Sequence, residues 1–148
     1  MNKIILFLII PVLLVAGCSH NSQIDNNISL DTKHEINIDK LEVYHFHTTN
    51  QCYSCITIGK YAEDTVNTYF KDELESEKIV FAHINIDLPE NKDIVTKYGV
   101  TGSSLWIGTY KNGNFNADEK VVVWYKINNK DDYMTYLKGV IEQKLAGN

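Results

Sequence analysis

The sequence predicts an α/β fold in which a mixed sheet is flanked by helices. Segments with strand and helix patterning follow one another in the order βαβαββα. The first predicted strand ends in a short polar turn, and a Cys-x-x-Cys pair then begins a helix. An Asn-Gly turn separates the last two strands. Two βα alternations followed by a hairpin imply a sheet with parallel and antiparallel pairs.

Length and charge limit the possible functions. The chain has 148 residues, which suits one domain with a real core, and its formal net charge is -5. All 14 basic residues are lysine, so no arginine is present for bidentate recognition of phosphates or base edges. An acidic chain without a basic cluster argues against nucleic acid as a partner.

The first 39 residues have the composition of an export signal followed by a tether. A lysine and a short apolar run lead to Val-Ala-Gly and then Cys18. The run is too short for a comfortable membrane span but suits a secretory signal. Small residues before the cysteine resemble the lipobox of bacterial lipoproteins, which implies removal of residues 1–17 and lipidation of Cys18. Residues 18–39 read as a flexible polar tether and residues 40–146 as the folded domain.

Each element of that domain has its own signal. We predict strands at residues 42–47, 79–87, 104–110 and 120–127, with the second strand buried and parallel. Apolar residues at four-residue spacing predict a helix over residues 55–74, and the charged residues 71–78 read as a solvated connection. We also predict a helix from Pro89 to Tyr98, ended by Gly99, and a last helix capped by Asn128 or Asn129.

Cys52 and Cys55 carry the clearest chemical signal. The amides of a first helical turn stabilise a thiolate, so a cysteine placed there becomes a nucleophile near neutral pH. The second cysteine, three residues on, lies on the same helical edge and can resolve a mixed disulfide. Two other interpretations stay open: a copper or zinc site formed by both cysteines and His47, and a permanent disulfide. We expect Tyr53, between the cysteines, to be exposed and to contact the substrate.

Three histidines accompany the cysteine pair. His45 and His47 share one strand face because side chains alternate, and His83 follows in the next predicted strand. They are either partly buried core residues or participants in the thiol chemistry.

The element order with Cys-x-x-Cys at the first helix resembles the thioredoxin fold over the whole predicted domain. Two further segments support the resemblance: Ile-Asn-Ile-Asp at residues 84–87, and residues 97–106, which look like the stretch that carries the family's cis-proline. More narrowly, the chain is similar to small thioredoxin-like accessory subunits linked to nitrophenyl-compound reduction and arsenic resistance.

The resemblance assigns roles to individual residues. Cys52 is the attacking thiol and Cys55 the resolving one. Ser104 stands at the cis-proline position, so we expect a trans peptide or a rearranged loop there. In the family this loop binds substrate backbone, which implies the same role for Ser103 and Ser104. His45 stands where the family has a buried acid and is expected to move protons for Cys55.

Together these features predict a membrane-anchored, extracytoplasmic thiol-disulfide oxidoreductase that needs no cofactor. Its substrate is a protein or small-molecule disulfide or thiol, and a separate redox partner resets the pair. The alternatives are a lipoprotein that binds or delivers copper or zinc and an accessory subunit of a reductase complex.

Overall fold

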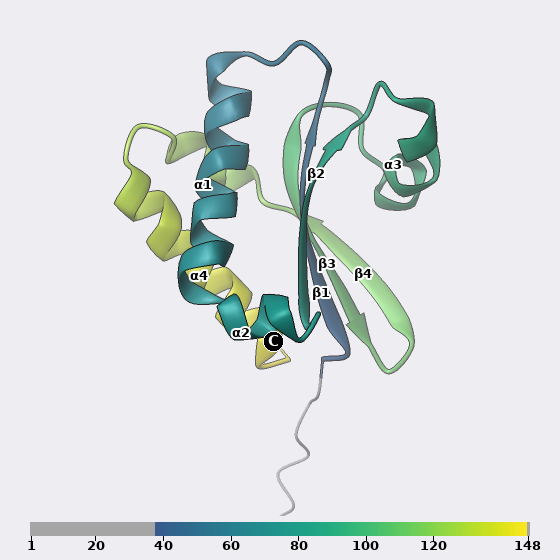
Figure 1. Cartoon of the computed structure of the whole chain (residues 1–148), viewed down its shortest axis with the longest axis vertical. Coiled ribbons are helices and arrows are strands. Elements are labelled where there is room, and N and C mark those ends of the chain that lie inside the picture. Colours follow the sequence, from purple (N-terminus) through teal and green to yellow (C-terminus); the bar gives the residue numbers. More distant parts are fainter. Residues whose placement is uncertain (1–37, 148) are drawn as a thin grey trace, which may run out of the picture. The chain divides into compact units, whose positions relative to one another are not determined.

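The computed structural model describes residues 38–147, so the predicted signal, Cys18 and nearly all of the predicted tether lie outside the described residues. Figure 1 shows the strands side by side with helices on both sides of them. The elements in chain order are β1 Lys40–His47, α1 Tyr53–Tyr69, α2 Lys71–Glu75, β2 Ile79–Asn85, η1 Pro89–Asn91, α3 Lys92–Tyr98, β3 Ser104–Lys111, β4 Asn114–Glu119, η2 Val121–Tyr125 and α4 Lys130–Leu145.

The four strands form one mixed sheet in the order β2-β1-β3-β4. Strand β1 pairs in parallel with β2 and antiparallel with β3, and β4 returns antiparallel to β3. Helix α1 makes the crossover between β1 and β2, while α4 packs beside α1. The prediction of a thioredoxin-like α/β fold with a mixed βαβαββα sheet is therefore confirmed.

The alternating side chains of β1 divide the core into two parts. Leu41 and Val43 are fully buried in the larger cluster, which also contains apolar residues of α1 and α4. Phe46 points to the other face and packs with Tyr98 of α3. Buried apolar side chains therefore stabilise β1 from both faces of the sheet. Each fully buried large side chain contributes about 1.5–3 kcal/mol to the free energy of unfolding.

Three predictions about the elements are wrong. The last strand is β4, and the predicted strand at residues 120–127 is mostly the 3-10 helix η2. The tight turn explains this, because it pairs Lys111 with Asn114 and brings Glu119 opposite Trp106. Residues beyond 121 would have to pair with residues that precede β3, so they form no strand.

The other two corrections concern residues 70–87. The long helix ends at Tyr69 because Phe70 leaves helical geometry and buries its ring, and the supposed solvated connection contains α2. Strand β2 is parallel as predicted but lies at the edge of the sheet, so most of it is only partly buried.

Local signals for turns and caps were reliable. Asn112 and Gly113 adopt the positive φ angles that a two-residue hairpin turn requires. Gly99 ends α3 in the left-handed conformation, and the Asn129 side chain caps α4 by accepting from the Asp132 amide. Between residues 38 and 147, no helix combines the length and apolar character that a membrane crossing needs.

Candidate functional site

Cys52 lies at the carboxyl end of β1, at the position that caps α1. Its backbone is extended, and its sulfur accepts a hydrogen bond from the Cys55 amide at 3.4 Å. The first turn of α1 contains no acidic residue that would oppose a negative sulfur. Cys52 is exposed and Cys55 is buried, so only the first sulfur faces incoming molecules.

The two sulfurs lie close enough to form a bond. Their separation is 2.7 Å, so a disulfide of about 2.0 Å needs only a small further approach. The pKa of Cys52 is below its ordinary value, chiefly because the Cys55 thiol donates to its sulfur and the Cys55 amide does the same. This is the electrostatic setting of a nucleophilic thiol.

The turn before Cys52 is fixed to the end of β2. The Thr49 amide donates to the Asp87 carboxylate at 2.8 Å, and the Asn85 side chain donates to the Thr49 hydroxyl at 3.1 Å. The Ile86 amide extends the strand pairing by donating to the His47 carbonyl. Asn85 and Asp87 therefore hold the turn that leads to Cys52, and neither residue is among the site residues predicted from the sequence.

The predicted substrate loop reaches the same edge of the sheet. Ser104 is paired with Phe46 near the end of β1, so the loop before it lies beside the end of the strand that leads to Cys52. The described peptide bonds are all trans, as expected at Ser104. The Ser104 hydroxyl donates to the Gly102 carbonyl and accepts from the Trp106 indole, which holds the loop closed on itself.

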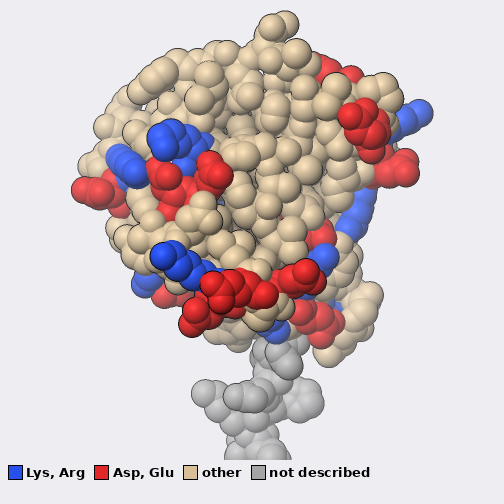
Figure 2. Space-filling model, in the orientation of Figure 1, with Lys and Arg blue, Asp and Glu red and all other residues tan. Residues whose placement is uncertain are grey.

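Two large apolar side chains are exposed beside Cys52, and the turn that precedes it is polar but uncharged. Tyr53 is 75% exposed, as predicted, and Ile56 on the next helical turn is 53% exposed. On the face shown in Figure 2, Lys, Asp and Glu gather at the lower edge and the sides. The upper end, where Figure 1 places the start of α1, is mostly uncharged on that face. A neutral segment can therefore approach Cys52 without desolvating many charges.

His45 lies beneath α1 and is 2% exposed. A Cβ atom added at Gly59 would come within 2.3 Å of the His45 Nδ1 atom, so this glycine lets the ring sit against the helix. Nδ1 lies 2.9 Å from Nδ1 of His83, the residue opposite it on β2. Burial lowers the pKa of His45 to about 3, aided by His83 and His47 and opposed by the Cys55 backbone.

A pocket of about 400 Å³ opens beside these rings, between α1 and the edge of the sheet. It is lined by His45, His47, Gln51, Ile56, Lys60, Glu63 and His83. Glu63 approaches His83 from α1, with 3.6 Å between a carboxylate oxygen and Nε2. The pocket therefore connects a buried imidazole with solvent through a second imidazole.

The described part of the chain contains no assembled set of metal ligands. Within residues 38–147, no three residues among His, Cys, Asp and Glu are placed to hold a metal ion together. The Nδ1 atom of His47 is engaged by the Thr48 carbonyl at 2.9 Å. The alternative of copper or zinc at Cys52, Cys55 and His47 therefore gains no geometric support.

The sequence singles out Cys52, Cys55, His45 and the loop at Ser103 and Ser104 as candidates, but Gly59 and Glu63 are not among its predicted site residues. A glycine inside a helix, one turn after the second cysteine, is a signal for close packing that the sequence does contain. The contact between Glu63 and His83 joins two elements across the pocket and has no sequence signal of its own.

Comparisons with known proteins return little. No family model and no curated protein matches the chain. Among solved structures, the chain is similar to thioredoxin O2 from Arabidopsis thaliana in the oxidised state. The two share 18% sequence identity with a TM-score of 0.45, over 72% of this chain and 76% of that chain. The fold assignment therefore depends on the strand order and crossover of this chain itself, and the narrower resemblance to accessory subunits stays a prediction.

Proposed function

We propose that the chain is a thiol-disulfide oxidoreductase in which Cys52 attacks and Cys55 resolves. The observation that carries this proposal is the exposed, helix-capping Cys52 sulfur, 2.7 Å from a buried partner sulfur. The lowered pKa of Cys52 increases the fraction present as thiolate, which is the form that attacks a disulfide.

The exchange takes place in two displacements. The Cys52 thiolate forms a bond to one sulfur of the substrate disulfide, and the other substrate sulfur leaves with the electron pair and takes a proton. Cys55 then loses its proton and attacks the Cys52 sulfur, which releases the second substrate thiolate. The protein gains a disulfide, and the substrate gains the two electrons.

The surroundings of Cys52 favour a disulfide in a neutral or apolar segment. Tyr53 and Ile56 are exposed beside Cys52, and the loop at Ser103 and Ser104 lies at the same sheet edge. We propose that these residues contact the substrate during the first displacement. A redox partner with a thiol pair of different potential then resets the protein, and the direction of flow follows from the two potentials.

The test compares two serine variants with a protein disulfide and with an alkylating agent. Cys52→Ser should abolish exchange, whereas Cys55→Ser should attack once and accumulate a mixed disulfide that gel electrophoresis detects. Alkylation of Cys52 in Cys55→Ser, followed against pH, isolates the thiolate of Cys52. Undiminished exchange by Cys52→Ser would refute the proposal.

We also propose that Cys18 carries lipid and holds the domain to a membrane surface outside the cytoplasm. The support is the sequence alone: an apolar run, three small residues and then the cysteine. Fractionation of cells that express wild-type or Cys18→Ala chains tests the anchor. The wild type should be found with membranes and be labelled by a fatty-acid analogue, and the variant should be unlabelled.

A further inference from the structure

A second pocket, of about 280 Å³, lies between the end of α3 and the start of β3. It is lined by the loop that joins these elements, by Trp106 of β3 and by Glu119 of β4. Trp106 and Glu119 are direct cross-strand partners, so the indole and the carboxylate stand on one face of the sheet. Ser103 and Ser104 also line the pocket, which is therefore continuous with the loop proposed to contact the substrate.

Glu119 gives this pocket its charge. Its side chain is exposed, and its carboxylate has no hydrogen bond or ion pair with any residue between 38 and 147. Lys120, the next residue, and Lys144 of α4 both pair with Asp118 instead, at 3.7 and 2.8 Å. Because successive side chains of a strand point to opposite faces, these pairs form on the other side of β4. The carboxylate of Glu119 is therefore available to a cation from outside.

The indole of Trp106 is already positioned in the pocket. Its Nε1 atom donates to the Ser104 hydroxyl at 2.9 Å, and its ring packs at right angles to Tyr98, with 6.0 Å between centroids. An aromatic ring attracts an ammonium or guanidinium group placed over its face. The hydroxyls of Thr101 and Ser103 line the same pocket, have no partner in the described chain and can accept hydrogen bonds from such a group.

We propose that this pocket binds a lysine or arginine side chain of the substrate, located close in sequence to the reacting disulfide. The proposal rests on the proposed function and deepens it, because it names a sequence feature by which the protein selects its substrate. The disulfide itself stays in a neutral segment beside Tyr53 and Ile56, and the basic side chain enters the pocket on the far side of the substrate loop. Since side chains alternate along an extended segment, the preference should be confined to one or two positions.

Other occupants fit this pocket less well. A divalent cation needs several oxygen or nitrogen ligands, and Glu119 is the one acidic or imidazole side chain among the described residues that line it. An anion would meet a carboxylate that no described cation neutralises. An apolar side chain would cover the carboxylate and the two hydroxyls without replacing the water that they bind.

Peptides with a coloured leaving group test the proposal. Each is a neutral peptide whose single cysteine forms a disulfide with thionitrobenzoate, with one lysine placed at each position around the cysteine in turn. The reference peptide has norleucine there, which keeps the length of the side chain without the charge. With the reduced full chain, the best lysine position should raise the second-order rate of thionitrobenzoate release about fivefold over norleucine.

Glu119→Gln should reduce that preference to less than about twofold and leave the rate of the norleucine peptide unchanged. High salt should reduce the wild-type preference in the same way, because Glu119 is exposed. The matched control is Glu75→Gln, which removes the same charge from an exposed side chain of α2. Helix α2 leads into the start of β2, beside the start of β1, whereas Cys52 follows the end of β1. Glu75→Gln should therefore keep the full preference.

The outcomes separate this proposal from the proposed function. No preference for lysine in the wild type, or an equal preference in wild type and Glu119→Gln, would overturn the proposal. An equal loss in Glu119→Gln and Glu75→Gln would also overturn it, since the preference would then reflect net charge. If the wild type releases thionitrobenzoate no faster than Cys52→Ser, the proposed function is refuted instead.

A binding measurement needs no thiol exchange. The Cys52→Ser chain is titrated with the best lysine peptide, its cysteine replaced by serine, while NMR follows the two indole N–H signals. The signal of Trp106 should shift with the lysine peptide, and Glu119→Gln should remove the shift. The signal of Trp124, which does not line the pocket, is the internal reference. An unmoved Trp106 signal would contradict the proposal even if the exchange rates differ.

Discussion

Strand β1 carries two buried ionisable residues, Glu42 and His45, that face opposite sides of the sheet. They differ in how completely their polar atoms are hydrogen-bonded. Glu42 is 5% exposed, and Lys40, Tyr98 and Tyr110 donate to its carboxylate. His45 is 2% exposed and one of its nitrogens has no partner. A buried group whose hydrogen-bonding atoms all have partners stabilises a fold, whereas a buried group with an unpartnered atom keeps the capacity to react.

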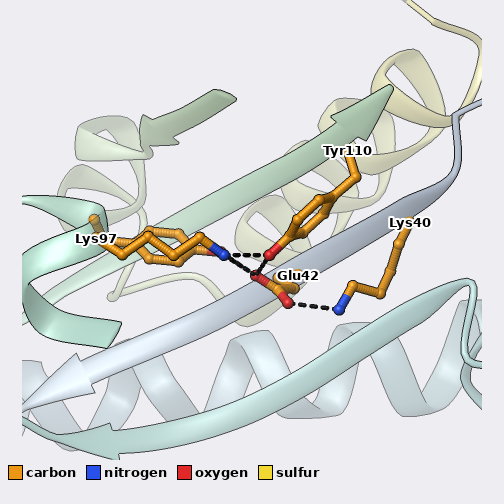
Figure 3. A network of polar contacts seen from close by, with 5 residues as sticks. Lys40, Glu42, Lys97 and Tyr110 are labelled. Atoms are coloured by element: carbon orange, nitrogen blue, oxygen red, sulfur yellow. Dashed lines mark hydrogen bonds and ion pairs between the residues drawn. The ribbon is translucent and has the colours of Figure 1, made fainter. Parts of the chain in front are cut away.

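Figure 3 shows the network around Glu42. Lys40 contacts one carboxylate oxygen at 2.7 Å, and Tyr98 and Tyr110 donate to the other at 2.8 and 2.9 Å. Lys97 donates to the Tyr110 hydroxyl and lies 3.7 Å from the same carboxylate. Burial alone would raise the pKa of Glu42, but the hydrogen bonds from Lys40, Tyr98 and Tyr110 bring it below the ordinary value.

The largest predicted effect concerns Glu42, the residue whose carboxylate is fully hydrogen-bonded. Glu42→Gln keeps the shape but leaves two lysines without their carboxylate, so we expect a loss of about 2–3 kcal/mol in the free energy of unfolding. Both lysine side chains are about a third exposed, so water recovers part of the cost. Urea denaturation measures the loss, and Glu63→Gln should stay within about 0.5 kcal/mol of wild type. Equal losses in both variants would contradict this account.

The second prediction uses pH to separate the two groups. His45 has a folded pKa of about 3 against 6.5 in the unfolded chain, so between these values the unfolded state binds more protons. Its contribution is complete above pH 6.5 and is lost as pH falls, at up to about 1.4 kcal/mol per pH unit. The contribution of Glu42 is present above its ordinary value of 4.5 and is lost only below it, as pH falls through the lowered folded pKa.

Unfolding midpoints in urea between pH 7.5 and 5 check this difference. From the same slope, wild type should lose about 2 kcal/mol more than His45→Leu over this range, since the variant has no imidazole to protonate. Parallel curves for the two proteins would show that His45 does not stay neutral in the folded state.

Most of the fold followed from local rules in the sequence. The turn at Asn112 and Gly113, the stop at Gly99 and the Asn129 cap each depend on the chemistry of one or two residues, and each was predictable. The strand predicted at residues 120–127 is wrong because the register that the turn imposes overrides the apolar character of that run. The two-residue turn already left no strand partner for that run.

The candidate site likewise has a part that the sequence predicts and a part that it does not. The exposure of Cys52 and the burial of Cys55 follow from their places at a helix start, so spacing alone located them. The pairing of His45 with His83 and of His83 with Glu63 depends on sheet register and on the rotation of α1. Neither quantity can be read from one sequence, because a strand can slip by two residues without changing its pattern.

The third prediction tests how tightly the ring of His45 is held. In an open helix, Gly→Ala usually gains about 0.5–1 kcal/mol, and Gly139 in α4 offers that case because no atom lies within 4 Å of the added Cβ. At Gly59 the same methyl would meet the His45 ring, so we expect Gly59→Ala to lose about 1–2 kcal/mol by displacing it. Thermal or urea unfolding of the two alanine variants should give opposite signs. A gain in both would mean that His45 moves freely.

The smallest predicted effect concerns a carboxylate that is exposed, unlike Glu42. Asp87 accepts from the Thr49 amide at 2.8 Å, and a hydrogen bond of this kind contributes about 0.5–1.5 kcal/mol because water competes for both partners. Asp87→Ala should therefore lose about 1 kcal/mol of stability, and Glu90→Ala, which removes an exposed carboxylate on the following turn, should lose less.

The informative measurement is the alkylation rate of Cys52. The turn that Asp87 holds leads directly to the cap of α1, so its loosening should slow alkylation while the Glu90→Ala rate stays at the wild-type value. If both rates match wild type, the start of α1 orders itself without support from β2.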